Sequence, residues 1–162
     1  MRSALIWNNP WSRDGKLLIE ALPLAAMDHY RQDHASKPEA GGIFLGYRRG
    51  MHLHITVATV PQPSDQRKRY WFKRSTTHHQ QVALQHWKAS GQTMDYLGEW
   101  HTHPEQHPAP SQLDLSEWRK ICEVRPHPMV FAILGWGGEL WLGVSEGRAV
   151  ERCTLTGFGP LD

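Results

Sequence analysis

The chain has few cysteines and no long apolar run. Its 162 residues include two cysteines, Cys122 and Cys153, which form neither a C-x-x-C motif nor any spacing typical of metal ligands. A disulfide framework or a thiolate metal site is therefore not expected. No segment approaches the roughly 18 apolar residues that a membrane span needs, and residues 1–16 are too polar for a signal peptide. These absences predict a reduced, cytoplasmic protein.

A strong net charge is also missing. The 18 Lys and Arg residues are balanced by 16 Asp and Glu residues, which leaves a formal charge of +2. This gives no general attraction to nucleic acid or to a membrane, and neither is expected as a partner. The basic stretch at residues 67–69, followed by Tyr70 and Trp71, could contact nucleic acid. The near-neutral charge favours instead a solvated loop or contact with an anionic partner surface.

Length and patterning predict one α/β domain, residues 1–162. Residues 17–33 carry apolar side chains at helical spacing, with Pro23 near the helix start. Further helices are expected over residues 76–88 and for about a dozen residues from Ser111. Strands are expected at residues 43–47, 53–60, 70–72, 96–101, 129–136, 139–144 and 149–155. This mixture indicates an α+β sheet or an α/β/α sandwich.

Histidine and tryptophan are abundant, at 11 and 8 residues. The histidines of the second expected helix, His78, His79 and His86, are interpreted as a solvated face. Four tryptophans suit core positions in their elements: Trp87, Trp118, Trp136 and Trp141. Trp7 and Trp11 lie in a polar N-terminal segment, where they could pack in the core or present a contact surface.

The most informative segment runs from residue 98 to residue 114. His101 and His103 stand two apart at the end of an expected strand, so both imidazoles point to the same face. Ser111 and Asp114 stand three apart on the first turn of an expected helix. A carboxylate there can be aimed back at the histidines. Two histidines and one aspartate with an open fourth position form the pattern of a catalytic zinc site.

Such a site also needs a general base, and two carboxylates compete for that role. Glu39 precedes Gly41-Gly42 and an expected strand, where the backbone can approach closely. Glu99 lies two residues before His101 and therefore faces the same way; it could alternatively orient a ligand histidine. Ser111 could serve as an N-cap, a catalytic hydroxyl or both. His107, in the proline-rich loop, could touch substrate or metal, but a plain surface position is favoured.

These residues resemble the JAMM (MPN-plus, Mov34/PAD-1) metallopeptidases. The family pattern is Glu, then His-Ser/Thr-His-Pro, six residues, Ser, two residues and Asp. Here Glu39, the run from His101 to Pro104, Ser111 and Asp114 supply every element at that spacing. The resemblance implies an α/β/α sandwich around a curved mixed sheet, of the kind that cytidine deaminases also have. It further implies zinc held by His101, His103 and Asp114, with Glu39 as acid and base and Ser111 binding the water or the oxyanion.

Within this family, residues 95–105 and Trp118 are similar to small bacterial proteins of integrative and conjugative elements. Those proteins are encoded beside ubiquitin-activating and ubiquitin-conjugating-like enzymes in anti-phage operons of the CBASS type. The resemblance implies an isopeptidase in the bacterial cytoplasm that removes a protein conjugated through its extended C-terminal tail. That protein would be ubiquitin-like or a cGAS-like nucleotidyltransferase. Two alternatives remain: a peptidase that processes small peptides or sulfur-carrier precursors, and a non-catalytic MPN-type scaffold.

Overall fold

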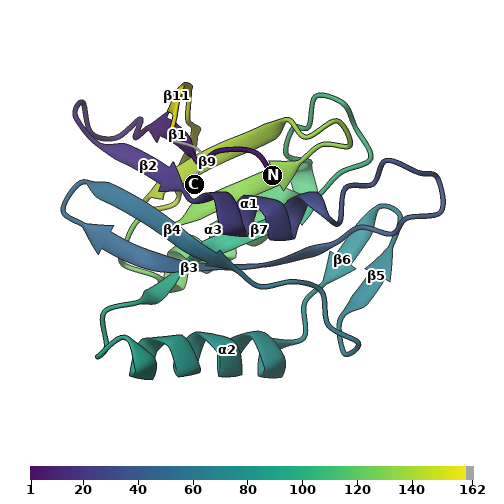
Figure 1. Cartoon of the computed structure of the whole chain (residues 1–162), viewed down its shortest axis with the longest axis horizontal. Coiled ribbons are helices and arrows are strands. Elements are labelled where there is room, and N and C mark those ends of the chain that lie inside the picture. Colours follow the sequence, from purple (N-terminus) through teal and green to yellow (C-terminus); the bar gives the residue numbers. More distant parts are fainter. Residues whose placement is uncertain (160–162) are drawn as a thin grey trace.

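The computed structural model describes residues 1–159. In this range a nine-stranded, mixed and curved sheet has the order β10-β9-β8-β7-β3-β4-β2-β1-β11, and β5 and β6 form a separate hairpin at its side (Figure 1). The strands are β1 Leu5–Asn8, β2 Lys16–Ile19, β3 Gly41–Arg49, β4 His52–Ala58, β5 Gln66–Lys68, β6 Trp71–Lys73, β7 Asp95–Thr102, β8 Val130–Leu134, β9 Leu140–Glu146, β10 Ala149–Arg152 and β11 Leu155–Phe158. The helices are α1 Ala21–Asp28, α2 Thr76–Ala89 and α3 Gln112–Val124.

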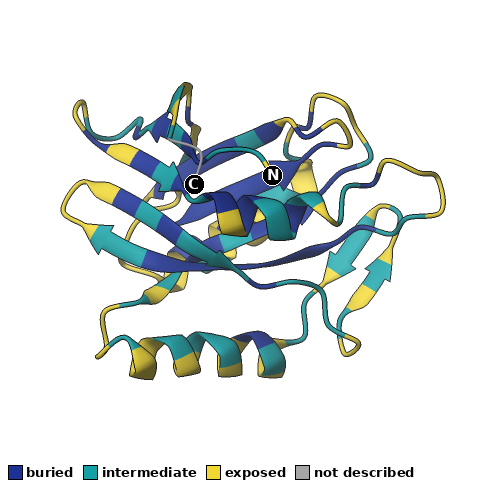
Figure 2. Cartoon of the chain, in the orientation of Figure 1, coloured by how far each residue is buried: buried dark blue, intermediate teal, exposed yellow. Residues whose placement is uncertain are grey.

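The sheet separates two apolar clusters, one under α1 and one under α3. β8 shows this directly, because its side chains alternate between the two faces. Val130, Ala132 and Leu134 belong to the α1 cluster, whereas Phe131 and Ile133 pack with α3. Strands buried on both faces run through the centre of the molecule (Figure 2). The α/β/α sandwich expected from the sequence is confirmed.

The first expected helix is only partly right. Residues 16–19 form β2, whose alternating Leu17 and Ile19 pair in parallel with Leu53 and Ile55 of β4. The helix is confined to α1, and Pro23 falls in its first turn, where the missing N–H costs no intrahelical bond. A short apolar run suits a helix or a buried strand equally well, and pairing with β4 decides between them.

The C-terminal strand was predicted as one element and is two. β10 pairs with β9 at one edge of the sheet, and β11 pairs with β1 at the opposite edge. Cys153 lies between them as a buried residue, and both cysteines of the chain are free thiols. β1 and β5 were not predicted, because each is short and follows no clear alternation of apolar and polar residues.

The tryptophans divide differently from the prediction. Trp118 is buried and stacks on Trp141, which is half-buried against the same cluster. Trp87 and Trp136 are exposed, at 36% and 41%, so their predicted core positions are wrong. Trp87 lies near the end of α2, and Trp136 lies in the turn after β8.

The N-terminal tryptophans are not a contact surface. Trp7 is a buried core residue of β1. Trp11 is half-buried, and its indole N–H donates to the carbonyl of Val144 at 2.7 Å. Of the two alternatives for these tryptophans, packing against the core is confirmed.

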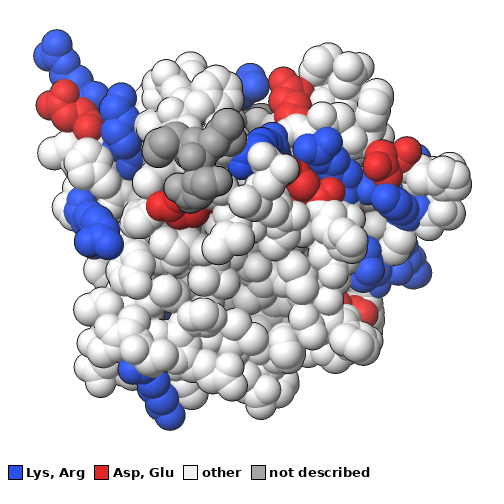
Figure 3. Space-filling view, in the orientation of Figure 1, with Lys and Arg blue, Asp and Glu red and all other residues white. Residues whose placement is uncertain are grey.

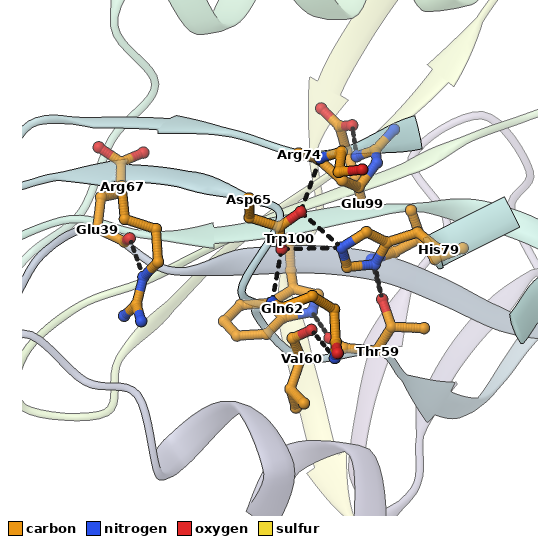
Figure 4. Close-up of polar contacts among 12 residues, drawn as sticks. Glu39, Thr59, Val60, Gln62, Asp65, Arg67, Arg74, His79, Glu99 and Trp100 are labelled. Carbon is orange, nitrogen blue, oxygen red and sulfur yellow. Dashed lines mark hydrogen bonds and ion pairs between the residues drawn. The ribbon is translucent and has the colours of Figure 1, made fainter. Parts of the chain in front are cut away.

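His79 of α2 is buried, so its predicted place on a solvated helix face is wrong. The surface over α2 carries few charged groups (Figure 3), but His79 points inward and is 1% exposed. Its Nδ1 accepts from the Thr59 hydroxyl at 2.7 Å, and its Nε2 donates to Asp65 at 3.0 Å (Figure 4). Burial outweighs the attraction of Asp65 and lowers the pKa of His79, which favours the neutral ring.

Over residues 1–159, none of the helices has both the length and the apolar content that a membrane crossing requires.

Candidate metal centre

The adjacent strands β3 and β7 bring the predicted site residues together. β3 pairs antiparallel with β7, with Gly41 opposite His101. The chain just before β3 therefore lies beside the end of β7. This places Glu39 next to His103, since the N–H of Thr102 donates to the carbonyl of Ala40 at 2.9 Å.

The two histidines and Asp114 converge on one point. His101 Nε2 and His103 Nε2 lie 3.1 Å apart. The two carboxylate oxygens of Asp114 lie 3.2 Å from these nitrogens, Oδ1 from His101 and Oδ2 from His103. Ligands bound about 2.0–2.1 Å from a tetrahedral zinc ion stand roughly 3.3 Å from each other. The separation of the two histidine nitrogens and the distance from each to one Asp114 oxygen are close to this value.

Asp114 is aimed by the start of α3. Ser111 is the N-cap of this helix, and its hydroxyl accepts from the N–H of Asp114 at 3.1 Å. In return, Asp114 Oδ2 accepts from the N–H of Ser111 at 2.8 Å. This capping box fixes the carboxylate while leaving it facing the histidines. The predicted N-cap role of Ser111 is confirmed.

Asp114 and His101 shift the pKa values of each other towards the charged forms. Burial alone would raise the pKa of Asp114, but hydrogen bonds with His101 and His103 hold it well below the ordinary value. Burial would lower the pKa of His101, yet Asp114 raises it overall. His103 Nδ1 is buried with no hydrogen-bond partner in the described part of the chain, and Glu105 Oε1 lies 3.5 Å away. The negatively charged carboxylate of Asp114 is thus stabilised by the two imidazoles that it contacts.

Glu39 stands beside this group as a buried carboxylate. One of its oxygens and a nitrogen of each histidine lie within 4.8 Å of one another. Burial raises the pKa of Glu39 to about 7, against the opposing charges of His101 and His103. In the metal-free site this carboxyl group can therefore take up or release a proton near neutral pH. The backbone of Glu39 is tied to the β5–β6 hairpin by Arg67 (Figure 4).

Glu99 lines the same pocket as the two histidines but is paired with another residue, and His107 is not among the residues that line it. Glu99 faces the same side of β7 as His101, but its Oε2 accepts from Arg74 Nη1 at 2.7 Å. Its hydrogen bond is thus to an arginine on the hairpin side and not to His101 or His103. His107 bonds to Glu139 at 2.8 Å and its side chain is 79% exposed.

The site opens into a groove of about 740 Å³. One wall is the β6 side of the hairpin, with the side chains of residues 70–74, and the other is α3, with Leu113, Glu117 and Ile121. The aromatic wall and Arg74 were not recognised as site residues from the sequence. The run of basic and aromatic residues at 67–74 was the available signal, but nothing local indicated that it forms a hairpin beside the metal site.

The fold and this site are of the metallopeptidase type: two histidines and one aspartate with nitrogen and oxygen atoms 3.1–3.2 Å apart, a buried glutamate beside them and an open groove. Residues 20–150 match the profile of the prokaryotic homologs of the JAB domain, and the chain belongs to that family.

Curated relatives agree with this assignment. A protein of Pseudomonas aeruginosa (strain BWHPSA011 / Pa011) named CD-NTase/cGAS isopeptidase is 40% identical over 77% of this chain and 82% of its own length. One of Escherichia coli (strain TW11681) with the same name is 38% identical, over 80% and 82%. A probable metalloprotease of Sinorhizobium fredii (strain NBRC 101917 / NGR234) is 31% identical, over 73% and 79%.

The solution structure of a Desulfitobacterium hafniense protein has the same fold. It superposes with a TM-score of 0.55 over 80% of this chain and 81% of its own, at 18% sequence identity. This likeness bears on the architecture alone.

Proposed function

We propose that this protein is a zinc-dependent isopeptidase that releases a protein conjugated through its C-terminal tail. The observation that carries the proposal is the convergence of His101, His103 and Asp114 at 3.1–3.2 Å beside the buried Glu39. All the chemistry-bearing residues are present, which disfavours a non-catalytic scaffold. The names of the curated relatives support a cGAS-like nucleotidyltransferase as the conjugated protein.

The side chains divide the work. A zinc ion held by the two histidines and Asp114 would polarise the scissile carbonyl and lower the pKa of water. Glu39 takes the proton of the attacking water and returns it to the leaving amine. The hydroxyl of Ser111, which lines the groove, donates to the negative oxygen of the tetrahedral intermediate. Its proton is free for this, because the hydroxyl only accepts in the capping box.

The groove supports an extended substrate. Glu39, His101, His103 and Asp114 line it together with residues 70–74 and residues of α3. A linear tail can lie along such a groove as an added strand. In this proposal the chain, residues 1–162, works as one catalytic domain in the bacterial cytoplasm within anti-phage defence. It requires neither nucleic acid nor a membrane.

The experiment compares two substrates that share one C-terminal tail. In the first, the tail of a cGAS-like nucleotidyltransferase is joined to a lysine side chain of a carrier protein. In the second, the same tail is joined to the carrier as a linear fusion. We expect the zinc-loaded enzyme to cut the isopeptide after the last tail residue, at least tenfold faster than the linear bond, with loss of activity on chelation. Equal rates would favour the peptide-processing alternative, and no cleavage of either would refute the proposal.

A further inference from the structure

Gln32 is a buried polar side chain that joins three segments around Glu39. It is 2% exposed and lies in the loop between α1 and β3. Its Nε2 donates to the carbonyls of Lys37 at 3.2 Å and Arg69 at 2.7 Å. Its Oε1 accepts from the hydroxyl of Thr102 at 2.7 Å. The whole amide is therefore used, and each of its bonds goes to a different part of the chain.

Thr102 connects this amide to the metal site. It stands between the two ligand histidines and is fully buried. Its hydroxyl has one proton, which goes to Gln32, and it accepts from the N–H of Ala40 at 2.9 Å. The N–H of Thr102 in turn donates to the carbonyl of Ala40 at 2.9 Å. The residue after Glu39 is thus fastened on both sides to the residue between the ligands.

The hairpin holds Glu39 from the other side. The N–H of Glu39 donates to the carbonyl of Lys68 at 2.7 Å, and its own carbonyl accepts from Arg67 Nε at 3.0 Å. Gln32 reaches the same hairpin through Arg69. Both attachments of Glu39, to the ligand strand and to the hairpin, therefore meet at the amide of Gln32.

We propose that Gln32 is a positioning residue that fixes Glu39 relative to the metal ligands. It acts through the hydroxyl of Thr102 on one side and the backbone of the hairpin on the other. The consequence for catalysis rests on the proposed function, whereas the consequence for the backbone of Glu39 does not. Removing the amide leaves the proton of the buried Thr102 hydroxyl without its acceptor and the half-buried Arg69 carbonyl without this donor.

The first test is amide hydrogen exchange in Gln32→Met, which keeps the length and volume of the side chain. We expect the amides of Glu39 and Ala40 to exchange at least tenfold faster, and that of Ile133 in β8 to be unchanged. Gln62→Met is the matched control, since the side chain of Gln62 donates to the carbonyl of Val60. Unchanged exchange at Glu39 and Ala40 would overturn the proposal.

The second test is kinetic and uses the isopeptide substrate above. We expect kcat of Gln32→Met to fall about 10- to 100-fold, as for small misplacements of a catalytic group, with KM within threefold and full zinc content. Thr102→Val should show the same fall in kcat as Gln32→Met. Thr102→Ser, which keeps the hydroxyl group, should have a kcat close to that of the wild type. If Gln32→Met does not fold, Thr102→Val provides both measurements.

The outcomes separate the two proposals. Loss of zinc from Gln32→Met, equal falls in Thr102→Ser and Thr102→Val, or an unchanged kcat would refute positioning while wild-type cleavage still stood. An inactive wild type with fast exchange in the variant would refute the isopeptidase and leave the structural role of Gln32 intact.

Discussion

At the residue scale, Glu39 combines a functional advantage with a cost to stability. Its carboxyl group is buried, and this burial raises its pKa to about 7. The folded metal-free protein therefore binds this proton more tightly than the unfolded chain. Proton binding by Glu39 therefore favours the folded state. This contribution to the free energy of unfolding is complete below the ordinary pKa of 4.5 and is lost as the pH rises through 7.

This imbalance predicts a pH-dependent gain for Glu39→Gln. In chelator-treated protein at pH 8, the variant should be more stable than the wild type by on the order of 1–3 kcal/mol. The difference should shrink as the pH falls from 7 towards 4.5, because the carboxyl group becomes protonated in the folded state. Urea unfolding at the two pH values measures it. A difference that does not change with pH would contradict the assigned environment of Glu39.

Ser111 is the N-cap of α3 and is also proposed to bind the tetrahedral intermediate, and substitutions can separate these two roles. Removing an N-cap hydroxyl costs about 1 kcal/mol in Ser→Ala but only a few tenths in Ser→Gly. Loss of a hydrogen bond to the tetrahedral intermediate should instead lower kcat about 100- to 1000-fold in both variants. We therefore expect Ser111→Gly to be nearly as stable as the wild type and as inactive as Ser111→Ala, by thermal unfolding and steady-state kinetics. A stable, fully active Ser111→Gly would reduce Ser111 to a cap.

At the scale of elements, the approach of β3 to its neighbours depends on glycine. A Cβ on Gly42 would lie 2.1 Å from the carbonyl oxygen of Thr59, which is backbone and cannot give way cheaply. Gly42 also pairs with Trp100 of β7, one residue before the first ligand histidine. Spacing between β3 and β7 thus sets the distance between Glu39 and the ligands.

Gly42→Ala should therefore lower both stability and activity. We expect the free energy of unfolding to fall by about 1–3 kcal/mol or more, as in overpacked cores. The melting temperature and the cleavage rate measure the two effects. Gly137→Ala is the control, since a Cβ there meets nothing within 4 Å. Equal stability of the two variants would show that β3 can shift without cost.

The sequence predicted which side chains converge better than it predicted the helices and strands. Periodicity and spacing suffice for His101 and His103, because two residues apart on a strand means one face. They also suffice for Ser111 and Asp114 on the first helical turn. Choosing Glu39 over Glu99 needed the resemblance to a family, since the pairing of β3 with β7 is a long-range contact.

The errors have the same origin. Leu17 to Ile19 became a strand because β4 offered a parallel partner, and His79 became a core residue because Asp65 and Thr59 could satisfy both of its nitrogens. Trp87 fitted a helix face but α2 turns it outward at 36% exposure. Gln32 left no local signal, since its partners are three carbonyl or hydroxyl groups brought together by the fold.

At the scale of the whole molecule, a cation bound by His101, His103 and Asp114 would link the end of β7 to the start of α3 and so stabilise the folded state. A ligand that binds only the folded state stabilises it by about 2.7 kcal/mol at 100 times its Kd. Zinc should therefore raise the melting temperature of the chelator-treated wild type by several degrees. His101→Ala should show less than half of that rise, as measured by calorimetry. An equal rise in both would place the bound ion elsewhere.

The most direct test of the account is cleavage of the isopeptide conjugate by zinc-loaded Glu39→Gln beside the wild type. The glutamine keeps the size of the side chain and leaves His101, His103 and Asp114 in place, but it cannot accept the proton of water. We expect one zinc per chain in both proteins, and a rate lowered at least 100-fold in the variant. A zinc-loaded variant that cuts the conjugate at the wild-type rate would contradict it.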